Sequence, residues 1–131
     1  MLEIYIDGAS KNNPGDASCG VVMFKEGKKV KESSVYIGKN TNNFAEYTAL
    51  VIALIEALHL GELNIKVFSD SQLLVNQIKD KYKVRRGSLY ALYKVVKILI
   101  DKFEKFSIDY VPRSKNKEAD KLANMALTLK S

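Results

Sequence analysis

The stretch from Leu2 to Ile37, LEIYIDGASKNNPGDASCGVVMFKEGKKVKESSVYI, decides how this chain folds. Alternation of apolar residues and enrichment in β-branched residues predict three strands, over Leu2–Ile6, Ser18–Phe24 and Val30–Ile37. A turn-rich segment, Asp7–Gly15, separates the first two strands, and a Glu-Gly-Lys hairpin signal joins the second to the third. Short connections of this kind predict three neighbouring antiparallel strands.

Helices and strands alternate after this stretch. Thr41, Asn42 and Asn43 are expected to cap a helix that runs to about Leu60 and stops at Gly61. The remaining expected elements are a strand over Ile65–Ser69, a helix from Asp70 to about Lys79, a helix over Ser88–Phe103, a strand over Phe106–Val111 and a helix capped by Asn116. Strands joined through helices pair in parallel. The prediction is an α/β fold with a mixed five-stranded sheet, three antiparallel strands then two parallel, flanked by about four helices.

The composition is that of a globular protein. We expect all 131 residues to form one domain, since that length is ordinary for one. The single cysteine, Cys19, cannot form an internal disulfide, which favours a cytoplasmic location. No signal peptide or membrane span is expected, because the longest apolar run, Ala49–Ile55, is too short to cross a bilayer. We expect a monomer.

The net charge of +6 favours a polyanionic partner, because Lys and Arg side chains release counterions from phosphates. Solubility alone is the alternative explanation of the charge.

Four acidic residues occupy special places in the predicted elements. Asp7 ends the first strand and Asp70 follows the fourth, so both should leave the same edge of a sheet in which these strands are parallel neighbours. Glu46 lies in the first turn of the long helix, and Asp120 lies in the first turns of the last one. All four carboxylates could therefore converge on one point.

Each acid also has an ordinary explanation. Glu46 has capping-box spacing to Asn43, and Asp70 could be a helix N-cap. Asp120 could interact with a helix dipole, and Asp7 could hold a turn. Together, however, four close carboxylates repel one another unless a cation is present. Hard oxygen ligands suit Mg²⁺ or Mn²⁺, and one histidine and one cysteine do not suit zinc.

The segments around these acids resemble the four motifs of the type 1 ribonuclease H family. The matching segments are Asp7-Gly8-Ala9-Ser10 with Asn13-Pro14-Gly15, Thr41 to Glu46, Ser69 to Val75, and Val111-Pro112-Arg113 with Asn116 and Ala119 to Asn124. They occur in the family's order across essentially the whole chain. The resemblance is to a compact form without a basic protrusion or an N-terminal hybrid-binding domain.

The resemblance implies an endonuclease that hydrolyses the RNA strand of RNA–DNA hybrids. Asp7, Glu46, Asp70 and Asp120 would bind two Mg²⁺ ions, with Mn²⁺ as a possible substitute, and cleavage would leave 5′-phosphate and 3′-hydroxyl ends. The 2′-hydroxyl contacts that distinguish RNA from DNA would come from Gly8, Ala9, Ser10 and Gln72. Asn13, Asn42 and Asn43 would contact sugar–phosphate backbones and minor-groove edges, and Thr41 a DNA phosphate.

Two departures from the family pattern stand out. The loop before Asp120 has no histidine, and Arg113 is the residue there that could contact a phosphate. The one histidine, His59, is 13 residues after Glu46, which at about 1.5 Å per residue places it about 20 Å away along the helix. A connector with five basic residues replaces the protrusion. These are Lys79, Lys81, Lys83, Arg85 and Arg86.

Three other functions remain open at this point. A broader duplex ribonuclease could also cut RNA–RNA, because recognition by shape tolerates related duplexes. A hybrid-binding module without catalysis could share the fold, although it would more naturally lack one of the four acids. A protein-interaction domain would leave the placement of the acids unexplained.

Overall fold

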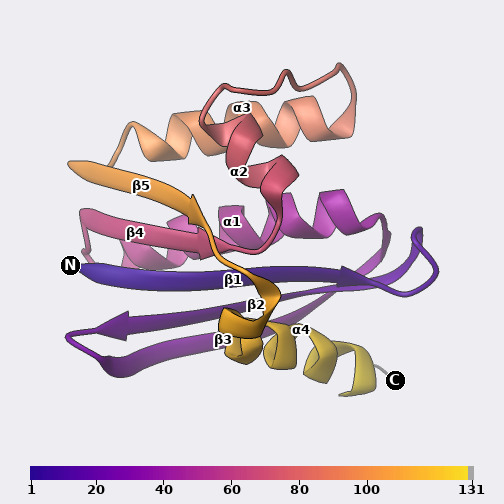
Figure 1. Cartoon of the computed structure of the whole chain (residues 1–131), viewed down its shortest axis with the longest axis horizontal. Helices are drawn as coiled ribbons and strands as arrows, with labels where there is room; N and C mark the ends of the chain where they lie inside the picture. The colour runs from indigo at the N-terminus through magenta and orange to yellow at the C-terminus, as the bar shows by residue number, and fades with distance from the viewer. Residues whose placement is uncertain (130–131) are drawn as a thin grey trace.

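The computed structural model describes residues 1–129, and Figure 1 shows their arrangement. The strands are β1 (Leu2–Ser10), β2 (Gly15–Lys25), β3 (Lys28–Asn40), β4 (Asn64–Ser69) and β5 (Lys105–Tyr110). The helices are α1 (Asn42–His59), α2 (Gln72–Ile78), α3 (Ser88–Ile100) and α4 (Lys117–Leu129), and a short 3-10 turn, η1 (Arg113–Lys115), precedes α4.

The five strands form one mixed sheet in the order β3-β2-β1-β4-β5. The strands β1, β2 and β3 pair antiparallel, and β4 pairs parallel with both β1 and β5. The predicted α/β fold is therefore confirmed, including the change from antiparallel to parallel pairing at β1. Ligands commonly bind beyond the carboxyl ends of strands at such a change.

Helix α1 covers one face of the sheet, and α3 packs against α1 at the top of Figure 1. Alternate residues of β1 point into this layer, and Leu2, Ile4 and Ile6 are fully buried there. Helix α1 is buried along most of its length because it contacts both the sheet and α3. No helix within residues 1–129 is long and apolar enough to span a membrane.

Helix α4 packs on the opposite face, over β1, β2 and β3 (Figure 1). The helix and β2 approach closely at Gly20, where an added Cβ would lie 2.1 Å from the carbonyl oxygen of Ala119. The Oγ atoms of Ser18 and Ser34 donate hydrogen bonds to carbonyls of α4, so polar contacts also fix its position.

Several element boundaries differ from the sequence predictions. Strand β1 continues through Asp7 to Ser10, because these residues pair with β2 instead of forming a turn. Helix α3 ends at Ile100 rather than Phe103, where two tight turns close the helix. Helix α2 begins at Gln72, and Ser71 rather than Asp70 is its N-cap. Gly61, with a φ of +78°, follows the end of α1 as predicted.

Candidate functional site

Three carboxylates meet just beyond the last residue pair between β1 and β4, Ile6 with Ser69. One oxygen from each of Asp7, Glu46 and Asp70 lies within 4.8 Å of the others. Asp7 and Asp70 leave the same edge because Ile6 pairs with Ser69 in the parallel register. Their predicted proximity is therefore confirmed.

Glu46 reaches the cluster because α1 crosses β1 at very short range. An added Cβ at Gly8 would lie 2.3 Å from both Ala45 C and Glu46 N, so only glycine fits there. The Gly8 amide donates a hydrogen bond to Glu46 Oε1. The capping box between Glu46 and Asn43 is wrong, because the Thr41 hydroxyl caps α1 through the Phe44 amide and Glu46 turns toward the sheet.

Asp120 lies at the border of the cluster rather than within it. It lines the same cleft and hydrogen-bonds Asp7, but it is not one of the three acids whose oxygens gather closely. Arg113 lies on its outer side, with 3.5 Å between Arg113 Nη2 and Asp120 Oδ1. The predicted convergence of four acids is thus a cluster of three with Asp120 beside it.

The electrostatics of the cluster favour a bound cation. Burial, followed by repulsion from Asp70, raises the pKa of Asp7 to about 8. Burial and the neighbouring Asp7 carboxylate raise the pKa of Glu46 well above its ordinary value. Burial also raises the pKa of Asp70, opposed by a hydrogen bond from Asn116 and the charge of Arg113. Close carboxylates that resist ionisation are a donor set that fits a hard divalent cation.

Without divalent cations, the protein is expected to become less stable as the pH rises from about 4 to about 8. The pKa of Asp7 is raised from 3.8 to about 8 by folding, so the folded state binds this proton more tightly than the unfolded state does. The stabilisation that comes from this tighter proton binding is fully present near pH 4, and it is lost as Asp7 ionises toward pH 8. Urea unfolding in EDTA at pH 5 and pH 8 measures the difference. The expectation is wrong if the free energy of unfolding is equal at both pH values or higher at pH 8.

The cluster opens into a cleft of about 550 Å³. Six of the predicted substrate residues line it, namely Gly8, Ala9, Ser10, Asn42, Asn43 and Arg113. Asn43 also lines a second cleft of about 670 Å³, so the two clefts adjoin. Gln72 is exposed at the start of α2 and is not among the residues that line either cleft.

The second cleft brings two predicted residues together with the basic connector. Asn13 and Thr41 line it together with Lys83, Arg85 and Arg86. Asn13 and Thr41 also have structural roles, because the Asn13 carboxamide accepts a hydrogen bond from the Asn42 amide and Thr41 caps α1. No helix interrupts the connector between α2 and α3, as expected of the compact form.

Sequence reasoning missed the part that Asn116 plays beneath the cluster. Its side chain is buried and donates a 2.8 Å hydrogen bond from Nδ2 to the carbonyl of Ile6, directly before Asp7. It also hydrogen-bonds Asp70, so it links α4 to both strands that carry the acids. The prediction that Asn116 caps α4 is not supported by its side chain, which turns toward β1 instead. The only feature of the sequence that could have indicated this role is the position of Asn116 in the fourth motif.

Comparison with known proteins supports this picture. Residues 5–126 match the family described as reverse transcriptase-like. The chain is 38% identical over 126 residues to the bifunctional protein Rv2228c of Mycobacterium tuberculosis, which covers 95% of this chain and 35% of that protein. It is also 40% identical to ribonuclease HI of Halobacterium salinarum over an aligned region of 127 residues, and this region covers 96% of this chain and 64% of that protein. The chain thus spans only about a third of the mycobacterial relative.

Solved structures share the whole fold. RNase H1 from Halobacterium salinarum superposes with a TM-score of 0.94 at 39% identity, covering 97% of each chain. LC11-RNase H1, solved in complex with an RNA/DNA hybrid, superposes with a TM-score of 0.93 at 36% identity, covering 98% of this chain and 97% of that one. The sequence match and the shared fold show that the chain belongs to the ribonuclease H-like family.

Proposed function

We propose that this chain is an endoribonuclease that hydrolyses the RNA strand of RNA–DNA hybrids in a divalent-metal-dependent reaction. The observation that carries the proposal is the cluster of Asp7, Glu46 and Asp70 beyond the last pair of β1 and β4. The name of the Halobacterium relative and the hybrid bound by LC11-RNase H1 support the reaction and the substrate. A cytoplasmic location and a monomeric state stay predictions.

Asp7, Glu46 and Asp70 would hold two Mg²⁺ ions, or Mn²⁺ in their place, with Asp120 as a further ligand at the border. Such ions activate an attacking water and stabilise a leaving oxygen, and this chemistry leaves 5′-phosphate and 3′-hydroxyl ends. The chain itself positions the ligands. The Gly8 amide holds Glu46, and Asn116 ties β1 and β4 to α4 beneath the acids. Arg113 lies where it can contact a phosphate entering the cleft.

The two adjoining clefts suit a duplex. The RNA strand would lie over the carboxylates, with its 2′-hydroxyls near Gly8, Ala9 and Ser10. The DNA strand would lie in the second cleft, with Thr41 and Asn13 near its backbone. Gln72 is exposed beside the clefts, and its predicted contact with RNA requires the duplex to reach the start of α2.

The direct test is cleavage of end-labelled duplexes. The protein should cut the RNA strand of an RNA–DNA hybrid when Mg²⁺ is added and not in EDTA, and the products should bear 5′-phosphates. A parallel RNA–RNA duplex shows whether the activity extends to that substrate. Failure to cut the hybrid in both Mg²⁺ and Mn²⁺ would contradict the proposed nuclease activity.

Neutralising the basic connector is expected to weaken hybrid binding in a salt-dependent way. Three of its cationic residues, Lys83, Arg85 and Arg86, line the second cleft. If each neutralises one phosphate, replacing all three by glutamine should make the slope of log K against log salt shallower by up to about 3. Binding is measured by fluorescence anisotropy at several salt concentrations. An unchanged slope would mean that these side chains do not contact the duplex, and the triple change Lys28→Gln, Lys31→Gln and Lys39→Gln on β3 is the matched control.

A further inference from the structure

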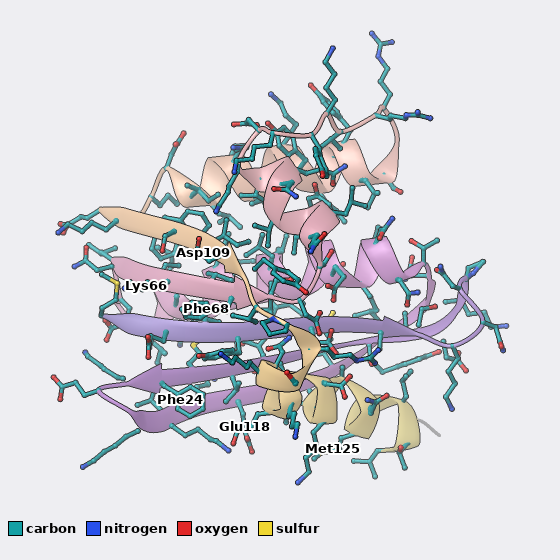
Figure 2. All side chains as sticks on the ribbon, in the orientation of Figure 1. Phe24, Lys66, Phe68, Asp109, Glu118 and Met125 are labelled. Carbon is teal, nitrogen blue, oxygen red and sulfur yellow. The ribbon has the colours of Figure 1, made fainter. Side chains whose placement is uncertain are left out.

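A row of aromatic side chains lies on the sheet face that carries α4. Tyr5 of β1 stacks against Phe68 of β4 with ring centroids 4.9 Å apart and planes at 26°. Phe24 of β2 meets Tyr5 edge-to-face at 6.0 Å. Figure 2 shows Phe24 and Phe68 on this face, with Lys66 beside Phe68. Three neighbouring strands therefore carry aromatic rings on this face, all three half-buried. Tyr5 and Phe24 also pack against the buried cluster of Val22, Ala119 and Leu122, so they lie along the side of α4.

A cavity of about 370 Å³ adjoins this row, in the size range of small-ligand pockets. Tyr5, Val22 and Phe24 give it an apolar lining, and Lys115 and Lys117 also line it. Glu3 adds a carboxylate that can accept a hydrogen bond from the exocyclic amine of a base. A planar ring with both an apolar face and polar edges suits such a lining.

The charges around the cavity favour an anionic backbone outside it. Among residues 1–129, Lys66, Lys115 and Lys117 form no ion pair. Two nearby acids have cationic partners, since Glu118 of the cavity lining lies 3.7 Å from Lys29 and Asp109 lies 3.1 Å from Lys79. Glu3, also in the lining, forms no ion pair within residues 1–129. Near the apolar lining, three lysines without an ion pair therefore outnumber the one acid without an ion pair, Glu3.

The cavity lies directly across η1 from the catalytic cleft. Arg113, the first residue of η1, lines the catalytic cleft, whereas Ser114 and Lys115 line the cavity. Asn116 also lines the cavity and is bonded to Ile6 and Asp70 beneath the cluster. The second cleft, proposed for the DNA strand, shares no residue with η1. A strand that passes the carboxylates and Arg113 can therefore reach the aromatic row, and it is the RNA strand that the cluster contacts.

We propose that an unpaired extension of the RNA strand binds to the open face, meaning the aromatic row of Tyr5, Phe24 and Phe68 with its adjoining cavity and lysines. The open face would hold one base in the cavity against Tyr5 and Phe24, a further base against Phe68, and phosphates beside Lys66, Lys115 and Lys117. The inference rests on the proposed function for the identity of the strand. Aromatic rings on adjacent strands of an open sheet, flanked by lysines, are a recurring way to bind single-stranded nucleic acid. The preferred substrate is then a hybrid with a single-stranded RNA end, rather than a blunt duplex.

Steady-state cleavage of matched hybrids tests this. The substrates are a blunt hybrid, hybrids with a six-nucleotide RNA extension at either end of the RNA strand, and a hybrid with the same extension on the DNA strand. One RNA-extended hybrid should have a KM about five- to tenfold lower than the blunt hybrid, as expected for the loss or gain of one stacked base, with kcat unchanged. The DNA extension should have no effect. If no extension changes KM by more than about twofold, the proposal is overturned.

Variants of the open face separate binding from folding. Phe24→Leu with Phe68→Leu keeps apolar packing but removes the rings, and Lys115→Gln with Lys117→Gln changes only exposed side chains. Each pair should abolish the advantage of the RNA extension and leave cleavage of the blunt hybrid unchanged. Ile98→Ala, exposed on α3 on the other side of the molecule, should keep that advantage. Retention of the full advantage by both variant pairs would also overturn the proposal.

A direct binding measurement does not depend on catalysis. A single-stranded RNA hexamer with 2-aminopurine at one position should lose fluorescence when it stacks on the protein, and the two variant pairs should remove this quenching. Absence of quenching at every position contradicts docking on the open face. Failure to cut even the blunt hybrid would instead contradict the proposed nuclease activity, while quenching that the variants remove would still support the open face as a binding surface.

Discussion

Asp7→Asn is expected to lower kcat for hybrid cleavage by about a thousandfold or more. Asp7 is buried and interacts with the other three acids, and its carboxylate lies at the centre of the proposed metal site. A metal-centred reaction depends on several kcal/mol of charge stabilisation, and each 1.4 kcal/mol is a factor of ten in rate. Asparagine keeps the shape and removes the negative charge. Single-turnover cleavage at saturating Mg²⁺ measures the loss.

The same substitution should stabilise the metal-free protein at pH 8. The raised pKa of Asp7, about 8, shows that ionising this carboxyl works against the folded state. Removing it should raise the free energy of unfolding in EDTA by at least about 1 kcal/mol, the equivalent of less than one pKa unit. A variant that is inactive and also more stable separates a lost ligand from a damaged fold. Inactivity with lower stability would leave the metal-site argument without support.

Two comparisons set the scale of this effect. Asp101→Asn removes an exposed carboxylate just after α3 and should change neither rate nor stability. Asp120→Asn should have a smaller effect than Asp7→Asn, because Asp120 lies outside the group of three and faces Arg113. Equal losses for Asp7→Asn and Asp120→Asn would show that the four acids act as one set, although Asp120 lies outside the group of three.

The order of elements and the pairing of the sheet could be predicted because both depend on local signals. Apolar alternation identified the strands, and Gly61 ends α1 through a positive φ that glycine adopts freely. The extension of β1 through Asp7 to Ser10 could not be predicted in the same way. Those residues look like a turn in isolation and become strand only because β2 pairs with them from Ala17 to Gly20.

The site likewise has a part that local signals predict and a part that depends on long-range contacts. Asp7 and Asp70 were predicted to meet because strand direction alone sets the edge at which they leave the sheet. Glu46 and Asn116 were assigned local capping bonds, whereas their partners are Gly8, 38 positions away, and Ile6, 110 positions away. Short-range spacing cannot indicate bonds of that range. The motifs therefore predicted residues that the fold brings close together, but not the contacts that hold them in place.

Gly8→Ala is expected to cost about 3 kcal/mol or more of stability and to lower kcat by about a hundredfold. The new Cβ would lie 2.3 Å from the backbone of Ala45 and Glu46, and backbone cannot move aside as a flexible side chain can. Helix α1 would have to shift away from β1, and the bond from the Gly8 amide to Glu46 Oε1 would lengthen. A displacement of about 1 Å at a reacting centre is enough for a hundredfold loss of rate. Urea unfolding and kcat, measured at a temperature where the variant is folded, give the two numbers.

Gly61→Ala is the matched control for this substitution. Its Cβ meets nothing within 4 Å, and its φ of +78° alone should cost about 1 kcal/mol of stability without any loss of kcat. Gly8→Ala should also raise the Mg²⁺ concentration needed for half-maximal activity, whereas Gly61→Ala should not, because only Gly8 holds a proposed metal ligand. If Gly8→Ala lowers stability but leaves kcat and the Mg²⁺ dependence at wild-type values, then the close approach of β1 and α1 serves packing alone. Glu46 would in that case be positioned by α1 without the help of the Gly8 amide.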